Sequence, residues 1–121
     1  MKLRISGNSI RLRLTRSESE RLASGQRLQE RLDLPPAPLS YWLETKEVGE
    51  ISAWLGAGEL RITAPLDAVR RWSSSDEVGI EGAVPGASGK QIRLLIEKDF
   101  RCAHDPADVQ ADCFPNPREE K

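Results

Sequence analysis

The residues with the clearest potential for metal chemistry lie near the C-terminal end of the chain. Cys102 and His104 are separated by one residue, and Cys113 follows with three aspartates in between. Thiolate and imidazole are good zinc ligands, and one carboxylate could complete a tetrahedral set. The spacing matches no established zinc motif, so the alternative is two ordinary thiols and a solvated histidine. We expect no cofactor, and we keep these three residues as the candidate metal ligands.

A second candidate is a carboxylate in an otherwise apolar pattern. Leu28, Leu32 and Leu34 share one phase of a predicted strand, and Glu30 falls in the same phase. An ionised carboxylate inside a protein needs a partner. Glu30 is therefore a buried acid near a cleft, the carboxylate of a structural ion pair, or a residue that a β-bulge turns outward.

An enzyme is one alternative that these residues leave open. A metal- or carboxylate-dependent site would use Glu30, Glu97, Asp99, Cys102 and His104. The single histidine gives no basis for a Ser-His-Asp arrangement, and residues 86–90 (GASGK) lack the spacing of a phosphate-binding loop. We therefore predict no catalytic residue.

Positive charge is concentrated in the first quarter of the chain. Residues 1–31 hold eight bases and three acids, whereas the rest holds ten bases and sixteen acids. Nucleic acids are bound by clustered cations, and the candidates for this role are Arg4, Arg11 and Arg13. The net charge of −1 argues against such binding, and the acidic part of the chain could simply neutralise the basic part.

Two tryptophans fall on the outward phase of predicted strands. Trp42 lies out of phase with apolar positions 39, 41 and 43, and Trp54 with positions 51, 53 and 55. Tryptophan is enriched at binding hot spots, which predicts a surface for a protein partner or a second copy of the chain. The alternative is that the helices, or Phe100 and Phe114, cover both indoles.

Alternating apolar residues and short turns indicate the elements that position these side chains. Period-two patterns predict hairpins over residues 2–14 and 51–64, with further strands near 28–34, 39–43, 78–80 and 92–96. A short helix follows each hairpin. The first begins with a capping box formed by Thr15 and Glu18, and the second begins at Pro65.

The hydrophobic pattern recurs after fifty residues. Seven apolar positions within residues 3–28 coincide with apolar positions within residues 53–78 without a gap. Repeated units bury a shared core. We predict an α+β, β-dominated domain over residues 1–98, in which two pseudo-symmetric ββαββ units (1–48 and 51–98) form a small barrel or closed antiparallel sheet with two short helices. Residues 99–121 form a Pro/Asp-rich tail.

Four short motifs span nearly the whole chain. They are residues 7–14 (GNSIRLRL), 76–80 (DEVGI), 97–100 (EKDF) and 114–117 (FPNP). Together they resemble a small bacterial family catalogued as a domain of unknown function. That resemblance implies no activity and no known site.

A weaker, local resemblance concerns residues 7–9, 61–65 (RITAP) and 75–78 (SDEV). They are similar to AbrB/MazE-type swapped-hairpin DNA-binding domains, in which two strand–helix–strand units close a barrel. The resemblance implies a single-chain version that binds nucleic acid through Arg4, Arg11 and Arg13. Thr15 stands where that family has proline, and Ser75 where it has glycine.

The absence of a long apolar run and of a signal-peptide pattern predicts a cytoplasmic protein without a membrane segment. Two cysteines are too few for a disulfide framework. Our main prediction is a small bacterial binding or protein-interaction module without catalytic activity. An AbrB-like DNA-binding protein and a metal- or carboxylate-dependent enzyme are the alternatives.

Overall fold

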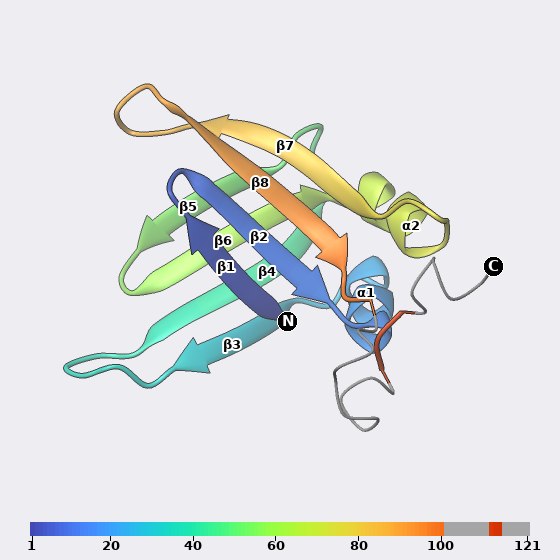
Figure 1. The fold of residues 1–121 in the computed structure, drawn as a ribbon, viewed down its shortest axis with the longest axis horizontal. Helices are drawn as coiled ribbons and strands as arrows, with labels where there is room; N and C mark the ends of the chain where they lie inside the picture. Colours follow the sequence, from blue (N-terminus) through green and yellow to red (C-terminus); the bar gives the residue numbers. More distant parts are fainter. Residues whose placement is uncertain (101–111, 115–121) are drawn as a thin grey trace.

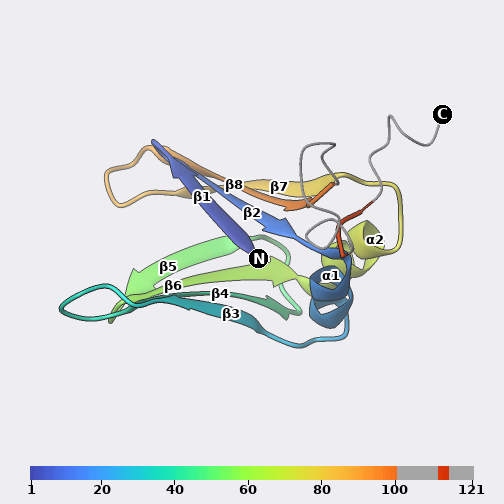
Figure 2. The ribbon, with the colours of Figure 1, turned by 60° about the horizontal axis from the view of Figure 1, so that its bottom comes forward.

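Two four-stranded sheets lie face to face, and two short helices pack at one end of both (Figures 1 and 2). This computed structural model describes residues 1–100 and 112–114. Figure 2 shows the sheets converging toward the helices and diverging toward the hairpin tips. In chain order the elements are β1 (Lys2–Ser6), β2 (Ser9–Leu14), α1 (Arg16–Ala23), β3 (Leu28–Leu32), β4 (Leu39–Lys46), β5 (Ser52–Gly56), β6 (Glu59–Pro65), α2 (Leu66–Ser73), β7 (Gly79–Pro85) and β8 (Gln91–Lys98).

Each sheet combines two hairpins from different halves of the chain. The terminal sheet, as we call it, has the order β1-β2-β8-β7, and the medial sheet has the order β3-β4-β6-β5. The central pairs, β2 with β8 and β4 with β6, are parallel. The outer pairs are antiparallel. The terminal sheet therefore depends on a pairing between strands that are distant in the sequence, whereas β5 alone separates β4 from β6 along the chain.

The predicted barrel of two ββαββ units is wrong. Neither sheet is closed, because β1 and β7 are edges of one sheet and β3 and β5 are edges of the other. The two hairpins of each predicted unit lie in different sheets, so residues 1–48 and 51–98 do not form separate units. The closed barrel implied by the likeness to swapped-hairpin domains is wrong for the same reason. The α+β, strand-rich class is confirmed.

The first helix begins where side-chain chemistry satisfies its first backbone donors, whereas the second begins after a proline. The predicted capping box of α1 is present: the Thr15 hydroxyl accepts from the Glu18 amide, and the Glu18 carboxylate accepts from the Thr15 amide at 2.9 Å. Pro65 is the N-cap of α2 and has no side-chain cap bond. The helices bury Leu22 and Trp72, respectively, at the end of the sandwich.

The core lies between the inner faces of the two sheets and the helices. Trp72 is fully buried, and its indole Nε1 donates to the carbonyl oxygen of Val78 at 3.0 Å. The other buried apolar residues of the cluster are Leu12, Leu14, Leu22, Leu28, Leu43, Ile51, Ile62, Ala64, Val69, Val84, Leu94 and Ile96. The period-two apolar residues of the hairpins thus face inward, which leaves the alternate positions on the two outer faces.

A close contact between the sheets occurs where β7 meets the residue before β5. A Cβ atom on Gly82 would lie 2.2 Å from Cγ2 of Ile51 and 3.5 Å from its Cβ. Ile51 is 8% exposed, so its side chain has little room to turn away. Gly82 is therefore required by close packing across the core.

We predict that Gly82→Ala lowers the free energy of unfolding by about 1–3 kcal/mol, since overpacking strains a dense core. Ile51→Ala removes Cγ2 at a cost of about 2–5 kcal/mol, and the double variant should lose less than the sum of the two. Urea unfolding followed by tryptophan fluorescence measures all three. Gly49→Ala is the matched control, because nothing lies within 4 Å of that position. Strict additivity of the two losses would contradict the contact.

Candidate functional site

A row of large side chains crosses the outer face of the medial sheet. Gln29 on β3 pairs with Trp42 on β4, Trp42 pairs with Arg61 on β6, and Arg61 pairs with Trp54 on β5. The sequence neighbours Leu28, Leu43 and Ile62 are buried. Since adjacent residues of a strand point to opposite faces, Gln29, Trp42 and Arg61 point outward. We give the name tryptophan–arginine row to the set of Gln29, Trp42, Arg61, Trp54 and Arg27.

Stacking of guanidinium groups on indole rings holds the row together. The guanidinium carbon of Arg61 is 4.4 Å from the ring centroid of Trp42 and 4.9 Å from that of Trp54. The guanidinium carbon of Arg27, which precedes β3, is 3.9 Å from the centroid of Trp42. Such cation–π contacts contribute about 0.5–1 kcal/mol each at exposed sites. The row is therefore ordered without any partner.

Glu59 fixes the orientation of the central arginine. Its Oε2 accepts from Nε of Arg61 at 3.1 Å and from Nη2 at 2.6 Å. Paired donors on one carboxylate restrict a guanidinium more than a single bond does. Arg61 thus presents a fixed planar surface between the two indoles.

The two tryptophans differ in exposure. Trp54 is 55% exposed, whereas Trp42 is partly buried beneath the arginines. The indole Nε1 of Trp42 is buried and has no hydrogen-bond partner within residues 1–100 and 112–114. An unsatisfied buried donor costs about 1–3 kcal/mol. The row would therefore be more stable if the Trp42 Nε1 donor had a hydrogen-bond acceptor.

The structure places both predicted interface tryptophans on the outer face of one sheet, with β6 between their strands. Phe100 and Phe114 lie elsewhere, in an edge-to-face pair with centroids 6.2 Å apart. Neither phenylalanine covers the indoles. Arg61 was not singled out from the sequence, although it is out of phase with the apolar positions 60 and 62.

Charge on this face of the medial sheet is positive. Lys46 pairs with Glu44 at 3.5 Å and Arg61 with Glu59 at 2.6 Å. Arg27 and Arg31 have no acidic partner among the residues that the structure describes. A partner that carries acidic groups would therefore meet uncompensated cations.

The candidate nucleic-acid residues lie together on the outer face of the terminal sheet. Arg4 faces Arg11 across β1 and β2, and Arg13 lies beside Glu97 across β2 and β8. The Glu97 carboxylate is 3.3 Å from Arg11 and 2.7 Å from Arg13. The three arginines thus share one face, as phosphate binding requires, but an acid lies among them. Nucleic-acid binding stays a prediction.

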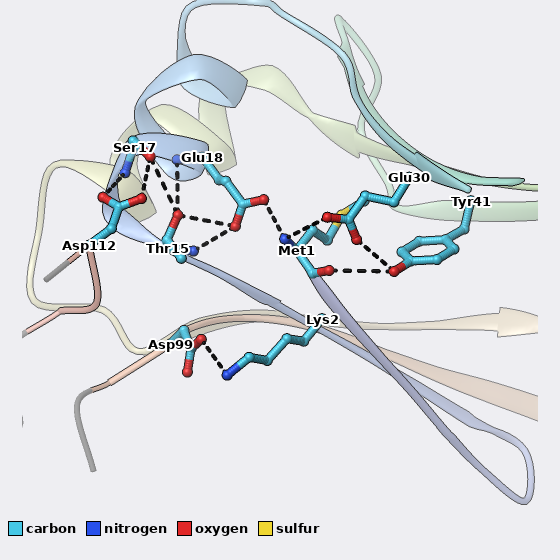
Figure 3. Close-up of polar contacts among 9 residues, drawn as sticks. All are labelled: Met1, Lys2, Thr15, Ser17, Glu18, Glu30, Tyr41, Asp99 and Asp112. Atoms are coloured by element: carbon cyan, nitrogen blue, oxygen red, sulfur yellow. Dashed lines mark hydrogen bonds and ion pairs between the residues drawn. The ribbon is translucent and has the colours of Figure 1, made fainter. Parts of the chain in front are cut away.

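Glu30 belongs to a polar cluster between the sheets (Figure 3). Its carboxylate is 3.3 Å from the Met1 ammonium and accepts from the Tyr41 hydroxyl at 2.6 Å. The Glu30 side chain is 41% exposed, so the acid is not enclosed. The Met1 ammonium also pairs with Glu18. Burial opposes ionisation of Glu18, but the ammonium and Thr15 outweigh it and lower the pKa of this carboxyl.

The carboxylates of the enzyme alternative lie in separate ion pairs. Glu30 binds Met1 and Tyr41, Glu97 binds arginines of β2, and Asp99 lies 3.1 Å from Lys2. Each has a structural partner of its own. No shared acid–base pair results from these contacts.

One of the three predicted metal ligands lies among the described residues. Cys113 is buried, whereas Cys102 and His104 lie outside the described residues. Within residues 1–100 and 112–114 no three side chains of ligand type come together to hold a metal ion. The metal site stays a prediction.

Comparison with known proteins identifies the family. A family of unknown function, DUF7009, matches residues 1–118. The chain belongs to this family. The resemblance drawn from the four short motifs is thereby confirmed, and DUF7009 brings no assigned activity. No curated protein and no solved structure matches the chain. No helix in the described part of this DUF7009 chain has the length and apolar character needed to cross a membrane.

We predict an unusual titration of Tyr41, the single tyrosine of the chain. Burial, followed by the hydrogen bond and the charge of Glu30, raises the pKa of Tyr41 from 10.0 to about 12. The stabilisation that Tyr41 provides is complete below pH 10 and is lost as the pH rises toward 12, because the unfolded chain releases this proton first.

Tyrosinate absorbance, recorded while circular dichroism shows an intact fold, measures this pKa. Glu30→Gln should lower the midpoint toward the ordinary value, since the negative charge is lost. A midpoint near 10 in the unaltered protein would contradict the geometry of the cluster.

Proposed function

We propose that this chain is a non-catalytic binding module of the bacterial cytoplasm, which binds a protein partner through the tryptophan–arginine row. The observation that carries the proposal is the 55% exposure of Trp54 beside the fixed guanidinium of Arg61. Tryptophan and arginine are the residue types most enriched at binding hot spots.

Preorganisation of the row favours tight binding. Arg61 is held by Glu59 and stacked on two indoles, so it loses little side-chain entropy when a partner docks. Trp54 itself lies on the edge strand β5, where a partner can approach the row.

The chemistry of the row selects an acidic partner. Arg27 and Arg31 have no acidic partner in the described structure. Together with Arg27, the outward-facing residues of the medial sheet include four bases (Arg27, Arg31, Lys46 and Arg61) and two acids (Glu44 and Glu59). We infer a protein segment with aspartate or glutamate beside an apolar or aromatic side chain. Its carboxylates would pair with Arg27 and Arg31, and its apolar group would cover Trp54.

The same charges disfavour a second copy of this chain as the occupant. A two-fold contact places each patch against itself, so this face would bring the bases of one copy against those of the other. Like-charge juxtaposition at an interface opposes association. A homodimer through this face is therefore an outcome that the experiment must distinguish.

Site-specific photo-crosslinking in cells identifies the occupant. A crosslinking amino acid replaces Ser52, which lies beside Trp54 on β5, and mass spectrometry identifies the captured chain. Binding of the purified partner is then compared between the original protein and Trp54→Ala. We expect at least about a tenfold loss of affinity, the scale of a hot-spot residue.

Leu34→Ala is the matched control, because Leu34 is 45% exposed but does not belong to the row. Its affinity should equal that of the unaltered protein. Capture of a second copy alone, no capture at all, or equal binding by the Trp54 and Leu34 variants would each overturn the proposal.

A further inference from the structure

The outer face of the terminal sheet brings like charges directly opposite one another. Arg4 faces Arg11, and Lys2 faces Arg13 on the next rung of the same face. Like charges at facing positions destabilise a β-hairpin. Four cations therefore occupy neighbouring positions that stability alone does not favour.

The acids of this face compensate these cations unequally. The Glu97 carboxylate lies near both Arg11 and Arg13, at 3.3 and 2.7 Å. Asp99 lies 3.1 Å from Lys2, and Glu81 pairs with Arg93 on β8. Arg4 has no acidic partner among the residues described. The pair of Arg4 and Arg11 is therefore the electropositive centre of the face.

Two hollows meet at this pair. One, of about 240 Å³, is lined by Arg4, Ser9, Arg11 and Arg93, among others, and also by the Glu81 carboxylate. The other, of about 160 Å³, is lined by Lys2, Arg4, Arg11 and Arg13. Arg4 and Arg11 line both, so one ligand can reach cations on either side of them.

We propose that this face binds a compact ligand with two linked phosphate groups, seated over Arg4 and Arg11. Guanidinium groups match phosphate oxygens with paired donors. A bound dianionic group would replace the repulsion between Arg4 and Arg11 with attraction to both. This inference is independent of the tryptophan–arginine row, which lies on the other sheet.

The acids of the face favour a compact ligand over a nucleic acid. A phosphate backbone that crosses the sheet would approach Glu97 and Asp99, each of which repels it. A ligand confined to the two hollows meets mainly the Arg4–Arg11 centre. Duplex DNA is therefore the competing occupant that the experiment must exclude.

Isothermal titration with inorganic pyrophosphate at low ionic strength tests the proposal. We expect saturable binding by the unaltered protein and at least about a tenfold weaker affinity for Arg4→Gln. The same variant should melt no lower than the unaltered protein without ligand, because it removes a repulsive pair. Arg21→Gln, an exposed arginine on α1, is the matched control and should bind pyrophosphate normally.

Three outcomes would overturn the proposal. They are the absence of pyrophosphate binding, an equal loss in the Arg4 and Arg21 variants, and tighter binding of duplex DNA than of pyrophosphate. The last would show a nucleic-acid surface, with an affinity that falls steeply as salt rises. None of these results bears on the partner captured beside Trp54, so the two proposals can fail separately.

Discussion

The parallel pairings of β2 with β8 and of β4 with β6 are the constraint on which the structure depends. Each joins a hairpin from one half of the chain to a hairpin from the other. These pairings also decide which side chains become neighbours on the outer faces of the sheets. Trp42 meets Arg61 across one parallel seam, and Arg13 meets Glu97 across the other. The tryptophan–arginine row therefore exists only when β4 and β6 have paired, and Glu97 reaches Arg11 and Arg13 only when β2 and β8 have paired.

The two outer faces use a central arginine in different surroundings. Arg61 lies between two indoles and is held by Glu59, so its charge is neutralised and its flat face is presented. Arg11 lies opposite Arg4 and shares Glu97 with another arginine. The first setting suits contact with apolar groups bordered by acids. The second leaves positive charge in excess and suits an anion.

Local patterns in the sequence predicted most of the elements but not their pairing. The capping box of α1, the inward phase of the hairpins and the outward phase of Trp42 and Trp54 all follow from residues close together in the chain. An apolar face can be buried against any facing sheet, so periodicity could not exclude the barrel. Which strands become neighbours depends on contacts across most of the chain.

The same limit applies to individual polar residues. The phase of Glu30 placed it among leucines, but no local spacing indicates its partners, which are Met1, just before β1, and Tyr41 on β4. Arg61 reads in the sequence as an ordinary solvent-facing position. Its role becomes visible only once β4 and β5 lie on either side of β6.

The order of strands in the two sheets also has a consequence for synthesis on the ribosome. The medial sheet is built from β3 to β6, which are consecutive in the chain, so all its strands emerge together. Among the strands of residues 1–100, the β1–β2 hairpin emerges first, yet its parallel neighbour β8 is the last to be made. Such non-local closure is slow, and an unpaired apolar hairpin is prone to aggregation meanwhile. The nascent chain must therefore carry the inner face of β1 and β2 without its final cover until β8 has been made.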